Sequence, residues 1–392
     1  MAENVLQQLQ ALDTSVITAV VRIDMRDPGL KIVDWAVEPL RHEKIIDTTG
    51  GLFHFSGQCT GIRGKQEWAV VLKWINNPIE SSQQPREWSY WKREFLAYHS
   101  GLLNDLPQGL RAPRCNGVVE NEQGVWAWIE YVQECTGKRW SLEDFQRTAR
   151  QLGKFQASYL KGAPVPQQPW LCRPFFRSIW AEDDWWFPYM NPASENNAWK
   201  SPIVQRAFRE DCRSRILQIL AERDRYFDAN DRLPQVLCHN DAHRRNFMWA
   251  LSPNTLKEEL IAVDWAFSGQ GAVGNDLGEL AGTSLYFLDF PLNEATDLLD
   301  SVLDTYLAGI TENGVTIDPR LVKLGYLIGL TFWMGLQLPG WAALMLSPEN
   351  GAYVQALYGA SPEEVLTRWA QLDVLLLDRA DEACGLIREL DL

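Results

Sequence analysis

Short runs of alternating apolar and polar residues fill the N-terminal third of the chain, and this period of two is typical of half-buried strands. The runs are rich in β-branched and aromatic residues and are separated by Gly and Pro, so they favour a mostly antiparallel sheet. A polar turn at 60–65 makes a hairpin that ends in Val71-Leu72-Lys73. We predict strands at 16–23, 31–37, 52–59, 67–75, 116–119 and 125–132.

From residue 142 onward, apolar residues recur three and four positions apart, which predicts amphipathic helices. One earlier segment has the same spacing, because its Trp and Phe residues alternate with charged ones. We predict helices at 85–103, 142–160, 202–229, 293–312, 319–335 and 362–390, interrupted by strands at 235–238, 247–251 and 260–265.

These patterns predict an α+β protein of two lobes, a small β-rich lobe at 1–132 and a large, mainly helical lobe at 133–392. A length of 392 residues suits two lobes better than one minimal core. With 46% hydrophobic and 22% charged residues, the composition is in the globular range and excludes wholesale disorder or a fibrous repeat.

The net charge of -14 makes some partners unlikely candidates on physical grounds. An acidic surface repels phosphate backbones and anionic headgroups, so we expect neither nucleic acid nor membrane as a partner. Seven cysteines, without a C-x-x-C pair, are predicted to be reduced thiols. The N-terminus lacks the pattern of a signal peptide, and we find no apolar run of the ~18 residues that a membrane span requires. We predict a cytoplasmic protein, either a monomer or a homodimer.

Candidate catalytic residues lie at the ends of the short strands in the helical part. Phosphoryl transfer requires a group that orients the attacking hydroxyl, oxygen ligands for magnesium and a cation on the nucleotide phosphates. Asp241 and Asn246 share one loop, where the carboxylate can face a hydroxyl while the amide oxygen reaches a metal. Asp264 follows the next strand and can add a second oxygen ligand for the hard Mg²⁺ ion. Lys73 can supply the cation.

The run from His239 to Asn246, followed by a strand, a turn and Val263-Asp264-Trp265, resembles the aminoglycoside phosphotransferase and choline kinase family, distant relatives of protein kinases. Gly274–Leu280 looks like the family's G-x-D-L-A segment. The resemblance covers about 45 to 285 by motif order. It implies a protein-kinase-like bilobal fold and the ATP- and Mg²⁺-dependent phosphorylation of a hydroxyl on a small molecule, such as an amine-bearing antibiotic, an amino alcohol or a sugar.

The same resemblance implies roles for single residues. Asp241 would orient the substrate hydroxyl, and Asn246 and Asp264 would hold the metal. Lys73 would neutralise phosphate charge and pair with Glu94, or with Glu87 of the same predicted helix.

Six further residues are implied at the edges of this site. His239 would brace the loop by hydrogen bonding, and Asp276 would anchor it through backbone amides. Thr48 to Gly51 resembles the turn that covers the nucleotide, with Gly50 and Gly51 in contact. Glu130 and Val132 would belong to the hinge that reads adenine through its backbone, and GTP in place of ATP stays open.

An acidic, aromatic segment is the main candidate for the substrate site. Asp183 and Asp184 precede Trp186, and carboxylates beside aromatic rings suit an amine-bearing ligand. The alternative is a solvated acidic loop. His243 either contacts the substrate or hydrogen-bonds within its loop, and Arg244 and its neighbour are predicted as solvated charges rather than phosphate ligands.

Two other functions fit parts of the pattern. One is a catalytically inactive nucleotide-binding regulatory module, which the retention of Asp241, Asn246, Asp264 and Lys73 argues against. The other is a protein kinase, but the sequence has neither Asp-Phe-Gly nor Ala-Pro-Glu. The acceptor is not predicted, because the same phosphate machinery serves many acceptors.

Overall fold

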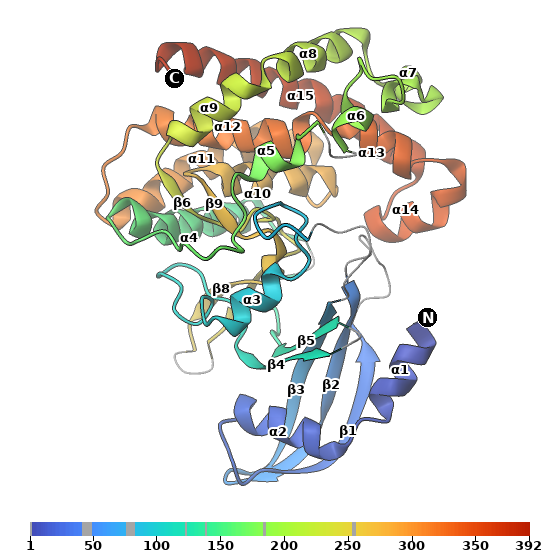
Figure 1. The fold of residues 1–392 in the computed structure, drawn as a ribbon, viewed down its shortest axis with the longest axis vertical. Helices are drawn as coiled ribbons and strands as arrows, with labels where there is room; N and C mark the ends of the chain where they lie inside the picture. Colours follow the sequence, from blue (N-terminus) through green and yellow to red (C-terminus); the bar gives the residue numbers. More distant parts are fainter. Residues whose placement is uncertain are drawn as a thin grey trace.

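The structure is a computed structural model that describes residues 2–40, 49–75, 83–121, 124–137, 139–182, 186–252 and 256–392. Figure 1 shows a β-rich part that carries the N-terminus and a larger, mainly helical part that carries the C-terminus. The boundary predicted between 132 and 133 stays a prediction, although the last strand of the N-terminal sheet ends close to it, at Glu130.

Five antiparallel strands form the N-terminal sheet in the order β1-β2-β3-β5-β4. Successive side chains of a strand point to opposite faces of a sheet. Along β3, Val70 and Leu72 join the core beneath the N-terminal helices, while Val71 joins the core shared with the helical part. Lys73, two residues after Val71, therefore lies on the face turned toward the helical part. The elements are β1 (Lys31–Pro39), β2 (Thr49–Gly61), β3 (Gly64–Ile75), β4 (Cys115–Asn121) and β5 (Gly124–Glu130), and helix α1 (Ala2–Gln10) packs against β1.

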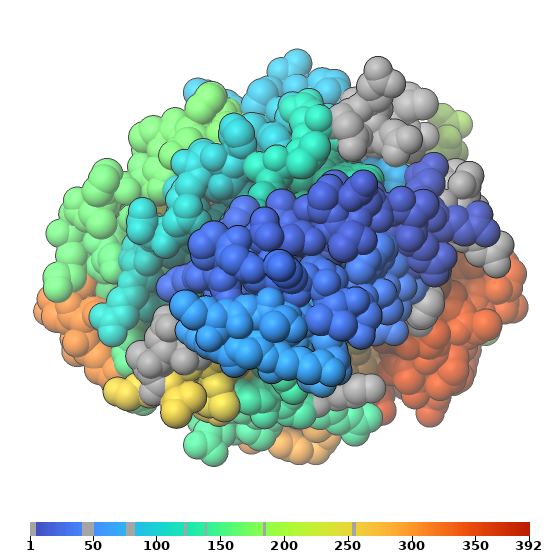
Figure 2. Space-filling view, turned by 90° about the horizontal axis from the view of Figure 1, so that it is seen from below, coloured from blue at the N-terminus to red at the C-terminus, as the bar shows by residue number. Residues whose placement is uncertain are grey.

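The strand predicted at 16–23 is wrong, because this segment lies inside helix α2 (Thr14–Asp24). Its β-branched residues are typical of strands. However, Ile17 and Val21 lie four positions apart and are both buried, and the Asp13 carboxylate accepts a hydrogen bond from an amide of the first turn. The N-terminal helices cover one side of the sheet and form the dark blue surface in Figure 2.

Helix α3 (Arg93–His99) is much shorter than the helix predicted at 85–103. The residues before it form turns, and three of their carbonyls accept hydrogen bonds from the Arg93 side chain instead of helical amides. The helix contacts β4 and β5 on one side and the short helix η2 (Trp265–Phe267) on the other. It therefore connects the sheet to the helical part.

The helical part is built around α4 (Leu142–Leu160), whose predicted bounds are confirmed. A capping box between Ser141 and Asp144 fixes its start. It packs closely on α11 (Ala295–Glu312), since a Cβ at Gly153 would lie 2.2 Å from the Tyr306 carbonyl oxygen. The other helices of eight or more residues are α8 (Glu210–Ala221), α9 (Arg223–Arg232), α10 (Asn275–Tyr286), α12 (Pro319–Leu330), α13 (Leu338–Met345), α14 (Gly351–Tyr358) and α15 (Pro362–Glu389).

Shorter elements complete this part, and some of them correct the sequence analysis. The helix predicted at 202–229 is three helices, α7 to α9, because the chain is extended at Phe208 and again changes direction at Glu222. The strands predicted at 235–238 and 247–251 are confirmed, and the one predicted at 260–265 lies at 258–262. The elements are β6 (Gln235–Cys238), β7 (Phe247–Leu251), β8 (Glu258–Ala262), β9 (Gly269–Ala272), α5 (Phe175–Ile179), α6 (Trp186–Met190), α7 (Pro202–Ala207), the π-helical turn η4 (Thr331–Gly335) and three-residue 3-10 turns at 198–200, 292–294 and 348–350.

One helical run, Pro319–Met345, is long and apolar enough to cross a membrane by length and composition alone. This finding corrects the expectation that no segment meets that test. Of its apolar 18-residue stretch, 83% is buried inside the protein, so packing in the core accounts for its composition. The seven cysteines are all free thiols, as predicted.

Candidate active site

A lysine and two carboxylates meet between the sheet and the helical part. The ammonium group of Lys73, on β3, contacts the Glu94 carboxylate of α3 and lies 2.7 Å from Oδ1 of Asp264. Lys73 and Glu94 are buried, whereas the Asp264 side chain is 43% exposed. The choice that the sequence left open between Glu94 and Glu87 is settled by this contact, because Glu87 is exposed.

The two carboxylates keep the buried lysine charged. Burial alone lowers the pKa of Lys73, but the negative charges of Asp264 and Glu94 outweigh burial and raise it. Burial raises the pKa of Glu94, and the ammonium group of Lys73 opposes that shift. A fixed, buried cation with an exposed carboxylate beside it is suited to bind a phosphate and a metal together.

The loop between β6 and β7 holds Asp241 with both carboxylate oxygens near a donor. Nδ2 of Asn246 donates to Oδ2 at 2.7 Å, and Nε2 of His243 lies 3.4 Å from Oδ1. Nδ1 of His243 accepts the backbone N–H of Arg245, which leaves Nε2 as the ring nitrogen that carries hydrogen. The Asp241 side chain is 19% exposed, so it is oriented by its neighbours and still open to a substrate.

Two buried carboxylates of α10 hold the backbone of this loop. Asp276 accepts the N–H groups of His239 and Asn240 at 3.0 and 2.9 Å, and Glu279 accepts that of Ala242 at 2.9 Å. Asn240 has a positive φ of 59°, a conformation that a non-glycine residue keeps only where its surroundings hold it. The predicted contact of Asp276 with backbone amides is therefore present.

Hydrogen bonds join this loop to the loop that carries Asp264. The backbone N–H of Val263 donates to the Asn246 carbonyl, and Nε2 of His239 donates to the Val263 carbonyl, both at 2.9 Å. Burial lowers the pKa of His239 to about 4, so the ring is neutral and acts as a hydrogen-bonded brace, as predicted. Asp264 itself has a φ of 64°.

The chemistry of these donors fits a nucleotide-bound magnesium ion. Because Nδ2 of Asn246 faces the Asp241 carboxylate, its Oδ1 is left as an acceptor for a cation. In the described residues no cluster of three or more His, Cys, Asp or Glu could hold a metal on its own. Mg²⁺ commonly takes one or two protein oxygens and completes its shell with phosphates and water. Asn246 and Asp264 match such a set.

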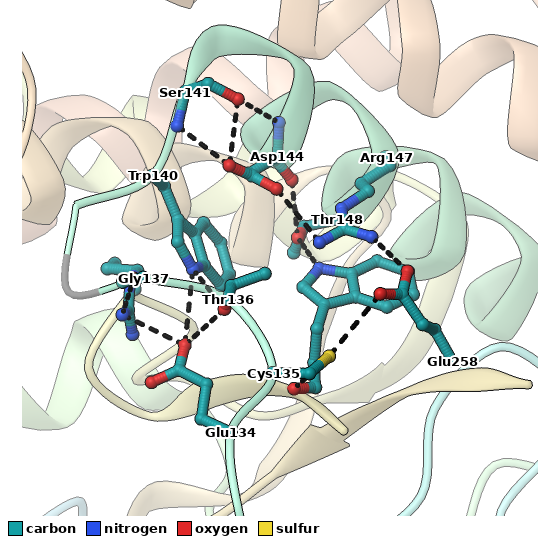
Figure 3. Close-up of polar contacts among 12 residues, drawn as sticks. Glu134, Cys135, Thr136, Gly137, Trp140, Ser141, Asp144, Arg147, Thr148 and Glu258 are labelled. Atoms are coloured by element: carbon teal, nitrogen blue, oxygen red, sulfur yellow. Dashed lines mark hydrogen bonds and ion pairs between the residues drawn. The ribbon is translucent and has the colours of Figure 1, made fainter. Parts of the chain in front are cut away.

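The chain that leaves β5 is fastened to the helical part. The backbone N–H of Cys135 donates to the Trp249 carbonyl at 2.7 Å, and Glu134 accepts from Thr136 and from Arg244. Figure 3 shows the contact of Glu134 with Thr136 near Ser141 and Asp144, which cap the start of α4. The backbone N–H of Glu130 donates to the Arg114 carbonyl, so it is not available to hydrogen-bond the adenine of a nucleotide.

Other predicted residues have mixed outcomes. Gly50 and Gly51 lie within β2, while Thr48 lies outside the described residues. Asp183 and Asp184 also lie outside them, and Trp186 is buried, with its ring 4.7 Å from that of Trp341. The contacts of Glu130 and Val132 with adenine stay predictions, except that the backbone N–H of Glu130 is already bonded to the Arg114 carbonyl.

The two arginines after His243 were predicted from the sequence to be solvated charges, and this prediction is wrong. Arg244 is buried, ion-paired with Glu134 at 2.9 Å. Arg245 forms two hydrogen bonds with the Asp289 carboxylate and lies over the Phe287 ring. Both side chains have protein partners, which accounts for them without a bound phosphate.

Sequence reasoning missed two residues that shape the site. Glu279 follows Asp276 by three positions, so the helical spacing could have placed both carboxylates on one face of α10. Arg93 precedes Glu94, and its side chain reaches the Ala266 carbonyl in the loop after Asp264. The sequence gives no sign of this contact, because its acceptor is a backbone group.

Comparisons with known proteins extend these findings. A family model described as "Phosphotransferase enzyme family" matches residues 96–312, more than half of the chain. No curated protein sequence matches. Among solved structures, a microcompartment-associated aminopropanol kinase aligns over 94% of this chain and 98% of its own, at 14% identity and a TM-score of 0.50.

Two further solved structures are similar at lower TM-scores. An amicoumacin kinase, solved with AMP-PNP and Ca²⁺, aligns over 92% of this chain and 95% of its own, at 15% identity and a TM-score of 0.47. A Plasmodium vivax ethanolamine kinase aligns over 95% and 88%, at 13% identity and a TM-score of 0.47. The likeness to the aminopropanol kinase confirms the predicted α+β, protein-kinase-like fold.

Proposed function

The chain belongs to the phosphotransferase enzyme family, as its motifs predicted, and from this premise we propose that it is an ATP- and Mg²⁺-dependent kinase that phosphorylates a hydroxyl of a small molecule. One observation carries the proposal. Lys73, Glu94 and Asp264 form one ion cluster, and two hydrogen bonds of Val263, with the Asn246 carbonyl and the His239 ring, connect the Asp264 loop to the loop of Asp241 and Asn246. Phosphate neutralisation, metal binding and hydroxyl orientation are thereby available within one connected unit.

In this proposal each residue has a defined task. Asp241 orients the acceptor hydroxyl and accepts its proton as the oxygen bonds to the γ-phosphorus and the bond to the ADP oxygen breaks. Lys73 neutralises phosphate oxygens, and Glu94 holds Lys73 in place. Asn246 and Asp264 hold the metal, which when bound neutralises charge on the phosphates.

The acceptor and the remaining contacts are proposed at a coarser level. An amine-bearing antibiotic, an amino alcohol or a sugar is the proposed acceptor class, in line with the names of the similar kinases. Residues 1–132 are proposed as the nucleotide-binding lobe and 133–392 as the catalytic and substrate-binding lobe. A cytoplasmic location and a monomeric or dimeric state remain predictions from the sequence.

Turnover of ATP across a panel of antibiotics, amino alcohols and sugars tests the proposal. We expect at least one compound to stimulate turnover by the wild type, and Asp241→Asn to lower kcat by about a hundredfold or more, the size of effect typical of a positioned acid–base group. Asp231→Asn is the matched control, since Asp231 forms a surface ion pair with Arg177. No stimulation by any compound, with nucleotide binding intact, would favour the inactive regulatory module.

A further inference from the structure

Arg93 is a fully buried arginine whose position next to Glu94 places it at the start of α3. A guanidinium group is costly to bury unless its donors are satisfied. The acceptors of Arg93 are backbone carbonyls from three separate segments of the chain. Nε donates to Trp170 at 2.9 Å, Nη1 to Trp88 at 2.9 Å and to Ala266 at 2.7 Å, and Nη2 to Pro85 at 3.2 Å and to Glu87.

The bond to Ala266 reaches the loop that follows Asp264. Three successive carbonyls of this loop each accept a side-chain hydrogen bond: that of Trp265 from Ser268 at 2.8 Å, that of Ala266 from Arg93, and that of Phe267 from Asn240 at 3.0 Å. Asp264 has a left-handed backbone conformation, which is strained for a non-glycine residue and persists only where neighbouring contacts hold it. These three bonds are contacts of that kind.

On its other side, α3 is part of the N-terminal sheet's packing. Phe95 is buried against Ile75 and Val125, which lie on β3 and β5, whereas the ion pair of Lys92 with Glu120 of β4 is partly exposed and contributes little. Arg93 therefore joins an element fixed to the sheet to a loop of the helical part. This link spans the two elements that carry Glu94 and Asp264, the carboxylates that Lys73 contacts.

We propose that Arg93 is a positioning residue, which locks α3 to the Asp264 loop so that the two carboxylates meet Lys73. The expected effect on nucleotide binding rests on the proposed function, but the structural link between α3 and the Asp264 loop does not. Lysine cannot replace this residue, because a single ammonium group has three donors and no planar fork to reach carbonyls in three segments. Met is the matching uncharged substitution.

Hydrogen exchange measured by mass spectrometry on the full chain tests the link directly. In Arg93→Lys we expect the amides of 264–268 and of α3 to exchange at least about tenfold faster, because charge-assisted hydrogen bonds to buried carbonyls are lost. Lys92→Met is the matched control: it removes the neighbouring cation, whose ion pair is partly exposed, and should leave exchange unchanged. A circular dichroism spectrum like that of the wild type shows that Arg93→Lys folds. If Arg93→Lys does not fold, the same exchange measurement is made on Arg93→Met.

Binding of Mg²⁺ and AMP-PNP, measured by calorimetry, gives the functional readout. We expect Arg93→Lys to raise the dissociation constant at least about tenfold and Lys92→Met to leave it unchanged. A wild type that binds no nucleotide would contradict the proposed function alone, since the exchange result still decides the link. Unchanged exchange at 264–268 in a folded Arg93→Lys would overturn the inference.

Discussion

Asp373, in the middle of α15, carries the most specific prediction about stability. Its side chain is fully buried, and in the described part of the structure neither carboxylate oxygen has a partner with hydrogen-bond geometry. Burial raises its pKa from the ordinary 3.8 to about 7, with only partial relief from the Cys212 thiol and the charge of Arg215. The folded state therefore binds this proton more tightly than the unfolded state does.

The sign and size of the effect follow from this difference in pKa. The stability that comes from the protonated form is present below pH 3.8 and is lost as the pH rises to about 7. Each pH unit corresponds to about 1.4 kcal/mol, so the full loss is roughly 4 kcal/mol, of which roughly 2 kcal/mol falls between pH 5 and pH 7. Asp373→Asn keeps the shape and removes the charge. It should make the protein more stable at pH 8 by roughly 1–3 kcal/mol, since the buried amide still lacks partners.

Urea unfolding at pH 5 and pH 8, followed by circular dichroism, measures this difference. We expect the wild type to lose more stability than Asp373→Asn between the two pH values. Asp378→Asn is the control on the same helix, because Asp378 is exposed and pairs with Arg215 at the surface. If Asp373→Asn and the wild type lose equal stability over this range, Asp373 does not carry the penalty and the reasoning is refuted.

Three further predictions concern packing and the site. Gly153→Ala should lower the free energy of unfolding by about 2 kcal/mol or more, because the new Cβ would meet the Tyr306 carbonyl. Gly385→Ala, where the new Cβ has open space, should raise the free energy of unfolding by up to about 1 kcal/mol, and thermal unfolding compares the two variants. Lys73→Met should raise the dissociation constant for Mg²⁺ and AMP-PNP at least about tenfold by calorimetry, and an equal affinity would remove Lys73 from the nucleotide site. Because burial lowers the pKa of His239 to about 4, its ring NMR signals should not shift between pH 6 and pH 8, and a titration in that range would contradict its role as a neutral brace.

The parts of the site that were predictable are those encoded within one short stretch of chain. Asp241 and Asn246 share a loop of fixed length, so their spacing alone indicates that they act together. Lys73 and Glu94 come from different elements, and their contact depends on how α3 packs on the sheet. A strand followed by a helix made this pair a reasonable prediction but left Glu87 as an alternative.

Elements without an amphipathic face were the hardest to predict. Every residue of α10 is buried, so the helix has no solvent-exposed face, and the polar face that carries Asp276 and Glu279 is turned into the protein rather than toward water as in a surface helix. The β-branched residues of α2 gave the opposite error, a helix mistaken for a strand. Arg93 was missed because it binds backbone carbonyls, which every sequence has.

Transfer of label from ATP labelled at the γ-phosphate tests directly whether the protein phosphorylates a small molecule through Asp241. The wild type and Asp241→Asn are each incubated with labelled ATP, Mg²⁺ and a metabolite extract, and the label is followed in the small-molecule, protein and inorganic phosphate fractions. We expect the wild type to move label to a small molecule and Asp241→Asn to do so at least about a hundredfold more slowly. Label that accumulates on protein, or that reaches a small molecule equally fast without the Asp241 carboxylate, would contradict it.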